Sequence, residues 1–129
     1  MNRSLFFLIA ALGAFGFGGL MFFAPAAAAQ LIGIQPSAAV FSVIHGMGGL
    51  ITGTAAMNLL ARKLQDRQAL QVILITNIVT HAFGLAADFW GIADGALTML
   101  KMAPVEATHL FVGIGSCIYL ARQRRDSTE

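Results

Sequence analysis

Long apolar runs separated by short polar or proline-containing segments dominate the chain. The runs cover residues 5–23, 38–61, 69–92 and 104–121. Each is close to the ~20 residues that a helix needs to cross a bilayer. Pro25 and Pro36 enclose an uncharged segment between the first two runs, which we expect to fold back on the bundle or lie in the membrane interface. The pattern predicts an all-α, four-transmembrane-helix bundle that forms a single domain.

Composition supports a membrane protein and leaves little room for a soluble function. Apolar residues make up 57% of the 129 residues and charged residues 11%, whereas soluble domains carry about 25% charged residues. Four spans with short connections use up the chain, so no separate catalytic domain is expected. The single cysteine, Cys117, cannot form an intramolecular disulfide and belongs to no zinc-binding pattern. These features argue against an enzyme of a soluble class and indicate contact with the lipid bilayer.

The basic residues predict the orientation of the spans. Seven of the eight lie at the two termini or in the 62–68 turn, and only Lys101 lies on the other side. Positive charge collects on the cytoplasmic side, so we expect both termini in the cytoplasm of a bacterial cell with the spans in its inner membrane. The position of the basic residues at the ends of apolar runs also argues against nucleic-acid binding. The first run resembles a secretory signal peptide as well, but its cleavage would split this charge pattern, which favours a retained helix.

Three histidines lie on three different apolar runs. Counting a rise of about 1.5 Å per residue, His45, His81 and His109 fall at similar depth in the outer half of the membrane. Polar residues accompany them in the third and fourth runs, namely Asn77, Asp88 and Glu106. Ionisable residues inside a bilayer face the bundle interior and point to a functional site. Neutral imidazoles bind haem iron and metals, and carboxylates orient them. One interpretation is therefore a site between the last three spans, with haem or a chlorin pigment as a candidate ligand and a quinone or proton path through His81 and Asp88 as the alternative.

Structural explanations compete with this site. Glu106 would complement the dipole of a helix that starts at Pro104. Asp88 lies near a helix end that disfavours an anion, so it needs a partner, for which Lys101 and His81 are the candidates. The histidines and Asn77 would otherwise form hydrogen bonds between helices, which contribute well under 1 kcal/mol on average. Gly49 and Gly53 have the spacing that permits close helix packing.

A glycine-rich first run, an uncharged proline-containing link, a second glycine-rich run that ends at Arg62 and Lys63, and a third run with His81 before Asp88 form a recognisable order. In this order the chain resembles the small four-helix bacterial membrane proteins grouped as DoxX-like and related families. The resemblance implies the four-helix fold and a bacterial inner membrane. It implies no chemistry for an individual residue.

Three functions follow from these observations. The first is a non-catalytic accessory subunit that packs against other subunits of a larger membrane complex, favoured by the glycine-rich faces and by the lack of a complete catalytic constellation. The second is a haem- or pigment-binding module that uses His45, His81 and His109. The third is a protein that handles a small molecule, a quinone or protons through His81 and Asp88.

Overall fold

The computed structural model describes residues 1–35 and 37–125. These residues form five helices, which are α1 (Arg3–Phe23), α2 (Pro25–Ile32), α3 (Ala38–Ala61), α4 (Arg67–Ala93) and α5 (Met99–Arg125). Four of them, all except α2, are long and apolar enough to cross a membrane. The prediction of an all-helical fold with four such helices is confirmed. Lipid is accordingly the expected neighbour of the many large apolar side chains that the bundle leaves exposed.

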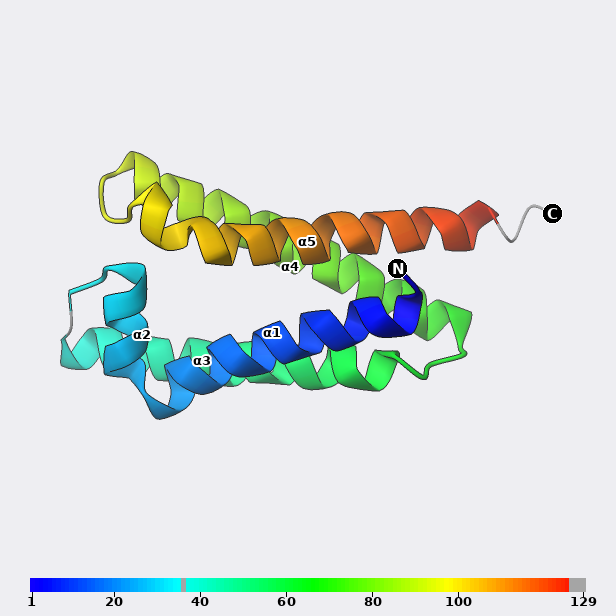
Figure 1. Ribbon diagram of the computed structural model, residues 1–129, viewed down its shortest axis with the longest axis horizontal. Coiled ribbons are helices and arrows are strands. Elements are labelled where there is room, and N and C mark those ends of the chain that lie inside the picture. The colour runs from blue at the N-terminus through cyan, green and yellow to red at the C-terminus, as the bar shows by residue number, and fades with distance from the viewer. Residues whose placement is uncertain (36, 126–129) are drawn as a thin grey trace.

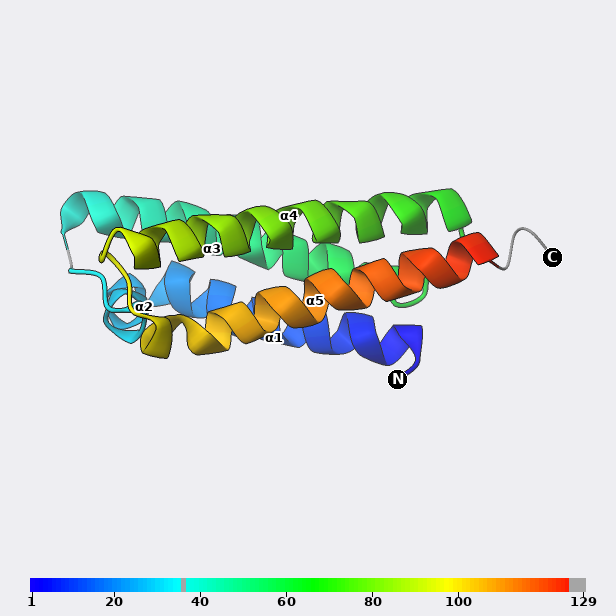
Figure 2. The same cartoon turned by 90° about the horizontal axis from the view of Figure 1, so that it is seen from above.

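The four long helices form two antiparallel pairs. Helices α1 and α3 lie side by side in one layer, and α4 and α5 form the other (Figure 1). The view from above shows α3 beneath α4 and α1 beneath α5, so the four helices occupy the corners of a square (Figure 2). The start of α1, the end of α5 and the turn before α4 lie at one end of the bundle, and α2 lies at the other.

Side chains just outside three helices bind the free amides of their first turns. Asn2 accepts a hydrogen bond from the Leu5 amide, Ser37 from Val40 and Asp66 from Ala69, at 2.8, 3.2 and 2.6 Å. These residue types are preferred at helix starts because their oxygens pair with otherwise unsatisfied amides. The caps explain why α1 and α4 begin two residues before the predicted spans, whereas α3 matches residues 38–61.

Residues 24–35 fold back on the bundle, which is one of the two predicted alternatives, and Pro36 lies outside the described residues. Pro25 starts α2, a position where its missing amide is harmless. Gly33, with φ at 84°, ends the helix in the left-handed conformation that glycine adopts without strain. Between them, Ala28 and Ala29 are buried against Met21 and Ile44. The sequence did not predict this segment as a helix because eight residues are too few to show a clear period.

Helix α5 starts at Met99, and the predicted start at Pro104 is wrong. The amides of Lys101 and Met102 both donate to the Thr98 carbonyl, so the first turn forms before the proline is reached. Glu106 therefore lies two turns inside the helix, where the dipole of the helix start no longer reaches it. The explanation of Glu106 as a helix-end carboxylate is wrong as well.

Glycines allow α1 and α3 to approach closely, but they differ from the predicted ones. A Cβ atom at Gly48 would lie 2.7 Å from the Phe22 nitrogen and 2.8 Å from the Gly18 oxygen. These neighbours are backbone atoms, which cannot move aside. Gly49 and Gly53 instead face outwards, with nothing within 4 Å of their Cβ positions. Within the described chain, close packing of α1 and α3 thus depends on Gly18 and Gly48. Of the glycines in α3, Gly48 is the one that faces α1.

Two apolar cores hold the bundle at its two ends. The first surrounds Phe6, Phe7 and Leu74 and joins α1 to the start of α4 and the end of α5. The second joins α1, α2 and α3 around Met21 and Ile44. Other polar side chains meet away from these cores, between α4 and α5 and between α3 and α4.

Candidate functional site

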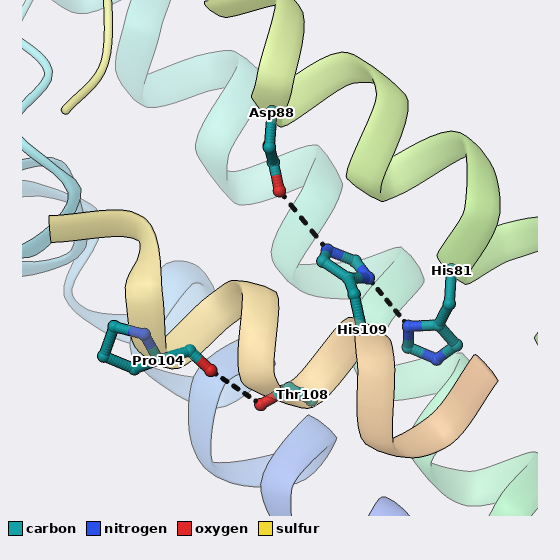
Figure 3. Close-up of polar contacts among 5 residues, drawn as sticks. All are labelled: His81, Asp88, Pro104, Thr108 and His109. Carbon is teal, nitrogen blue, oxygen red and sulfur yellow. Dashed lines mark hydrogen bonds and ion pairs between the residues drawn. The ribbon is translucent and has the colours of Figure 1, made fainter. Parts of the chain in front are cut away.

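His81 of α4 and His109 of α5 meet between the two helices. Their Nδ1 atoms are 2.7 Å apart, a short hydrogen bond in which one ring donates and the other accepts. The rings stand edge to face, with 4.9 Å between their centroids (Figure 3). The structure therefore joins two of the three predicted histidines directly.

Each histidine packs over a glycine of the opposite helix. A Cβ atom at Gly84 would lie 2.9 Å from both ring nitrogens of His109, and one at Gly113 would lie 3.5 Å from the Cβ of His81. Gly84 follows His81 by three positions, and Gly113 follows His109 by four. Because residues three and four apart share a helix face, each helix presents one imidazole and one gap for the imidazole of its partner.

Asp88 extends the pair of rings into a chain. Its Oδ2 atom lies 3.4 Å from His109 Nε2, the nitrogen that faces away from His81 (Figure 3). Both side chains are about one-fifth exposed, at 21% and 19%, so the contact is largely withdrawn from solvent. Of the two predicted partners, neither Lys101 nor His81 contacts the carboxylate. His109 fills this role because α5 brings it to the level of Asp88.

Glu106 completes the group. Its side chain is only 6% exposed, and neither carboxylate oxygen has a hydrogen-bond donor within the described part of the chain. The Asp88 carboxyl group is close enough to influence it electrostatically. A single proton held between the two carboxyl groups would satisfy both, whereas two bare carboxylates would repel each other in a buried place. We call His81, His109, Asp88 and Glu106 the α4–α5 polar chain.

The Asp88 carboxylate beside His109 Nε2 favours one arrangement of the protons on the two rings. When His109 donates from Nε2 to the Asp88 carboxylate, its Nδ1 is the acceptor in a neutral ring. His81 must then donate from its own Nδ1, which leaves its Nε2 with a free lone pair. No hydrogen bond or ion pair to that Nε2 atom occurs among residues 1–35 and 37–125. One end of the chain is therefore a free base, and the other is a pair of carboxyl groups.

Asn77 does not join this group, although it was predicted on the same face. It is fully buried and pairs with Asn58 of α3, whose side chain is 1% exposed. Asn77 donates to Asn58 at 2.8 Å and accepts from it at 3.4 Å. The two amides join the helix pairs across α3 and α4. The sequence signal for Asn58, a lone amide in an apolar run, was present and was not used.

His45 is also separate from the other histidines. It is exposed, and its nearest aromatic neighbour is Phe22, edge to face at 5.8 Å between centroids. The expected set of three histidines is therefore a pair plus one ring on the outer surface of α3. Similar depth along the chain did not imply proximity, because His45 points away from the α4–α5 interface.

A cavity of about 290 Å³ lies beside the polar chain, between the two helix pairs. We call it the central cavity. All five helices line it, and most of its lining is apolar. His81 and His109 form part of its wall, together with Thr80, Thr108 and Lys101. Its size is near the lower end of the range for small-molecule sites, which are typically apolar with a few polar groups.

A second cavity of about 340 Å³ contacts the other end of the polar chain. Asp88 lines it, together with Ile34 and Leu97 from the connections that precede α3 and α5. The two cavities share Ile32 but no member of the polar chain. The polar chain therefore connects a cavity wall at His81 with a different cavity wall at Asp88.

The histidine pair does not have the geometry of two ligands on one metal ion. Two imidazoles on a tetrahedral zinc-like ion would place their coordinating nitrogens about 3.3 Å apart, given a metal–nitrogen distance of about 2 Å, whereas the Nδ1 atoms are 2.7 Å apart. Among the described residues no three His, Cys, Asp or Glu side chains are grouped to hold a metal. The Nε2 atom of His81 and the ring of the exposed His45 each offer a nitrogen that could serve as a single axial ligand of a haem or chlorin. Pigment binding therefore stays a prediction.

Comparison with protein-family models, with curated proteins and with solved structures found no match to this chain. The resemblance to DoxX-like proteins therefore stays a prediction, and the function has to be argued from the site itself.

Proposed function

We propose that the chain is a multi-pass membrane protein that binds a small amphipathic molecule in the central cavity and exchanges a proton with it. The observation that carries this proposal is the polar chain, whose one end, His81 Nε2, belongs to a ring in the cavity wall. This is the third of the functions expected from the sequence, with His109 and Glu106 added to His81 and Asp88. The site accounts for four ionisable side chains that an accessory role would leave unexplained.

The proton moves along contacts that already exist. A bound molecule gives a proton to His81 Nε2, and His81 passes its Nδ1 proton to His109 Nδ1 across 2.7 Å. His109 then passes its Nε2 proton to Asp88 across 3.4 Å. At the end both rings are neutral with exchanged tautomers, and the added proton lies on the carboxyl pair. Such side-chain relays are a known role of intramembrane histidine and carboxyl groups.

Two glycines provide a test of binding in the central cavity. Gly13 lines the cavity and has open space at its Cβ position, so Gly13→Leu fills the cavity without a backbone clash. Gly16, on the same helix, also has open space but does not line the cavity, so Gly16→Leu is the matched control. Wild-type and variant proteins are purified in native lipid nanodiscs, and bound small molecules are extracted and identified by mass spectrometry. We expect at least one molecule to be present in wild type and Gly16→Leu and lost in Gly13→Leu. Identical extracts from all three would contradict the proposal.

We also propose four spans with both termini in the cytoplasm, in a bacterial inner membrane. Support comes from contacts at one end of the bundle, where Arg3 donates to the Leu64 carbonyl at 2.9 Å and Arg67 donates to the Gln123 carbonyl. Seven of the eight basic residues gather there. In a Cys117→Ser background, a membrane-impermeant maleimide added to intact cells should label Gly95→Cys and spare Gln65→Cys. The reverse labelling would overturn the orientation.

The accessory-subunit role has one observation in its favour. Gly49 and Gly53 are exposed with open space around them, which permits a helix of another chain to approach closely. The test is co-purification of a membrane partner with wild type, with the double variant Gly49→Leu/Gly53→Leu and with Gly16→Leu. A partner lost only in the double variant supports this role, and equal recovery in all three contradicts it.

A further inference from the structure

Lys101 is the one basic residue at the end of the bundle that carries α2 and the 94–98 connection. It lies in the first turn of α5 and lines the central cavity. No carboxylate or hydrogen-bond acceptor contacts its ammonium group within the part of the chain that the structure describes. A cation beside an apolar cavity without an acidic partner is complementary to an anionic group on a bound molecule.

The fold makes room for this lysine. The Lys101 side chain crosses Gly33, where a Cβ atom would lie 2.8 Å from its Cδ and 3.1 Å from its Nζ. Gly33 has a positive φ of 84°, which already favours glycine. The same glycine therefore ends α2 and leaves the space in which the lysine stem lies beside the cavity.

The remaining polar groups of the cavity are mostly occupied. Thr54 and Thr108 donate to carbonyls of their own helices, and the Asn58 amide pairs with Asn77. Besides the Thr80 hydroxyl, two nitrogen groups stay available to a ligand, which are the Lys101 ammonium and the His81 Nε2 lone pair. The first binds an anion and the second accepts a proton. A molecule that can use both is an acid.

We propose that the central cavity binds a single-chain monocarboxylic acid of the fatty-acid type. The neutral acid gives its carboxyl proton to His81 Nε2, and the carboxylate that results pairs with Lys101. The apolar chain lies against the cavity wall, which includes Phe17, Ile51 and Val105. One lysine without a second cation matches a group with one negative charge better than a phosphate monoester, which carries up to two. The inference rests on the proposed function, because it names the ligand class of the same cavity.

The test compares two probes of equal chain length, dodecanoate and dodecanol, on the purified full-length protein in nanodiscs. Binding is measured by displacement of a fluorescent fatty-acid analogue. We expect wild type to bind dodecanoate about tenfold more tightly than dodecanol, and Lys101→Gln to lose this preference while it still binds dodecanol. Lys63→Gln, at the opposite end of the bundle, is the matched control and should keep the preference. The helix content of each variant is checked by circular dichroism.

The outcomes separate this inference from the proposed function. If both probes bind equally to wild type and both are lost in Gly13→Leu, the cavity is a binding site and the acid assignment is wrong. If Lys101→Gln keeps the preference for dodecanoate, the role of the lysine is wrong. If neither probe binds, the acid assignment falls, and the extraction experiment with Gly13→Leu alone decides whether the cavity binds another molecule.

Discussion

Gly84→Ala is the substitution that tests the geometry of the polar chain with the smallest chemical change. One methyl group is added to α4 at the point where the His109 ring rests on it. The new Cβ atom would lie 2.9 Å from both ring nitrogens, which is closer than such contacts occur in proteins. His109 cannot keep its position, because it is held on one side by His81 at 2.7 Å and on the other by Asp88 at 3.4 Å.

The expected loss of stability is the sum of two effects. Forcing a methyl group into a packed contact costs about 1–3 kcal/mol. Losing the two contacts of His109 adds about 1 kcal/mol, since hydrogen bonds between membrane helices average about 0.6 kcal/mol each. Replacing a glycine in a helix by alanine also stabilises the helix by up to about 1 kcal/mol. Gly49→Ala has the same gain in helix propensity, and its new methyl group meets open space. The difference between the two variants in free energy of unfolding therefore cancels the propensity gain, and it should be about 2–4 kcal/mol.

The measurement is reversible unfolding in mixed micelles with increasing SDS, followed by circular dichroism, for wild type and both variants. Gly84→Ala should unfold at lower SDS than wild type, and Gly49→Ala at the same or higher SDS. If Gly84→Ala proves as stable as Gly49→Ala, the His109 ring does not rest on Gly84 and the arrangement of the polar chain is wrong.

The same unfolding assay tests two further contacts. Gly48→Ala places a Cβ atom 2.7 Å from the backbone nitrogen of Phe22 and should destabilise the α1–α3 pair by about 1–3 kcal/mol. Gly46→Ala, whose methyl group meets open space, should not destabilise the protein. Equal stability of the two variants would contradict the close approach of α1 and α3. A double-mutant cycle of Asn58→Leu and Asn77→Leu should give a coupling energy between about 0.6 and 1.7 kcal/mol, because each single change leaves a buried amide without its partner; strictly additive effects would show that the two amides do not interact.

Much of the fold follows from the sequence because the bilayer imposes one length on every span. Four apolar runs of about that length, separated by prolines or charges, predicted four helices that the structure contains. The start of α5 was misplaced because Pro104 was taken as the first residue of the helix. The Thr98 carbonyl accepts hydrogen bonds from two backbone amides that precede Pro104, so the helix has already begun. Local hydrogen bonding, and not the apolar pattern, determined that boundary.

The site was predicted only in part for a related reason. Helical periodicity places Asn77, His81 and Asp88 on one side of α4, yet that side contacts two different helices. Asn77 reaches α3 and the other two face α5. Which neighbour a residue meets depends on how the helices are arranged around it, and one helix's sequence does not contain that arrangement. Similar depth led to the expectation that His45, His81 and His109 share one site, and depth alone could not show that His45 lies exposed and apart from the other two.

The protonation of the two paired histidines tests the central claim most directly. We would measure nitrogen NMR spectra of the full chain labelled with ¹⁵N-histidine in nanodiscs, assigned with His81→Gln and His109→Gln, with the exposed His45 as an internal reference. The polar chain predicts neutral rings of opposite tautomer, with the proton on Nδ1 in His81 and on Nε2 in His109, and a change in the His109 tautomer in Asp88→Asn. Protons on Nε2 in both rings would leave two lone pairs facing each other across the 2.7 Å contact and would contradict the account.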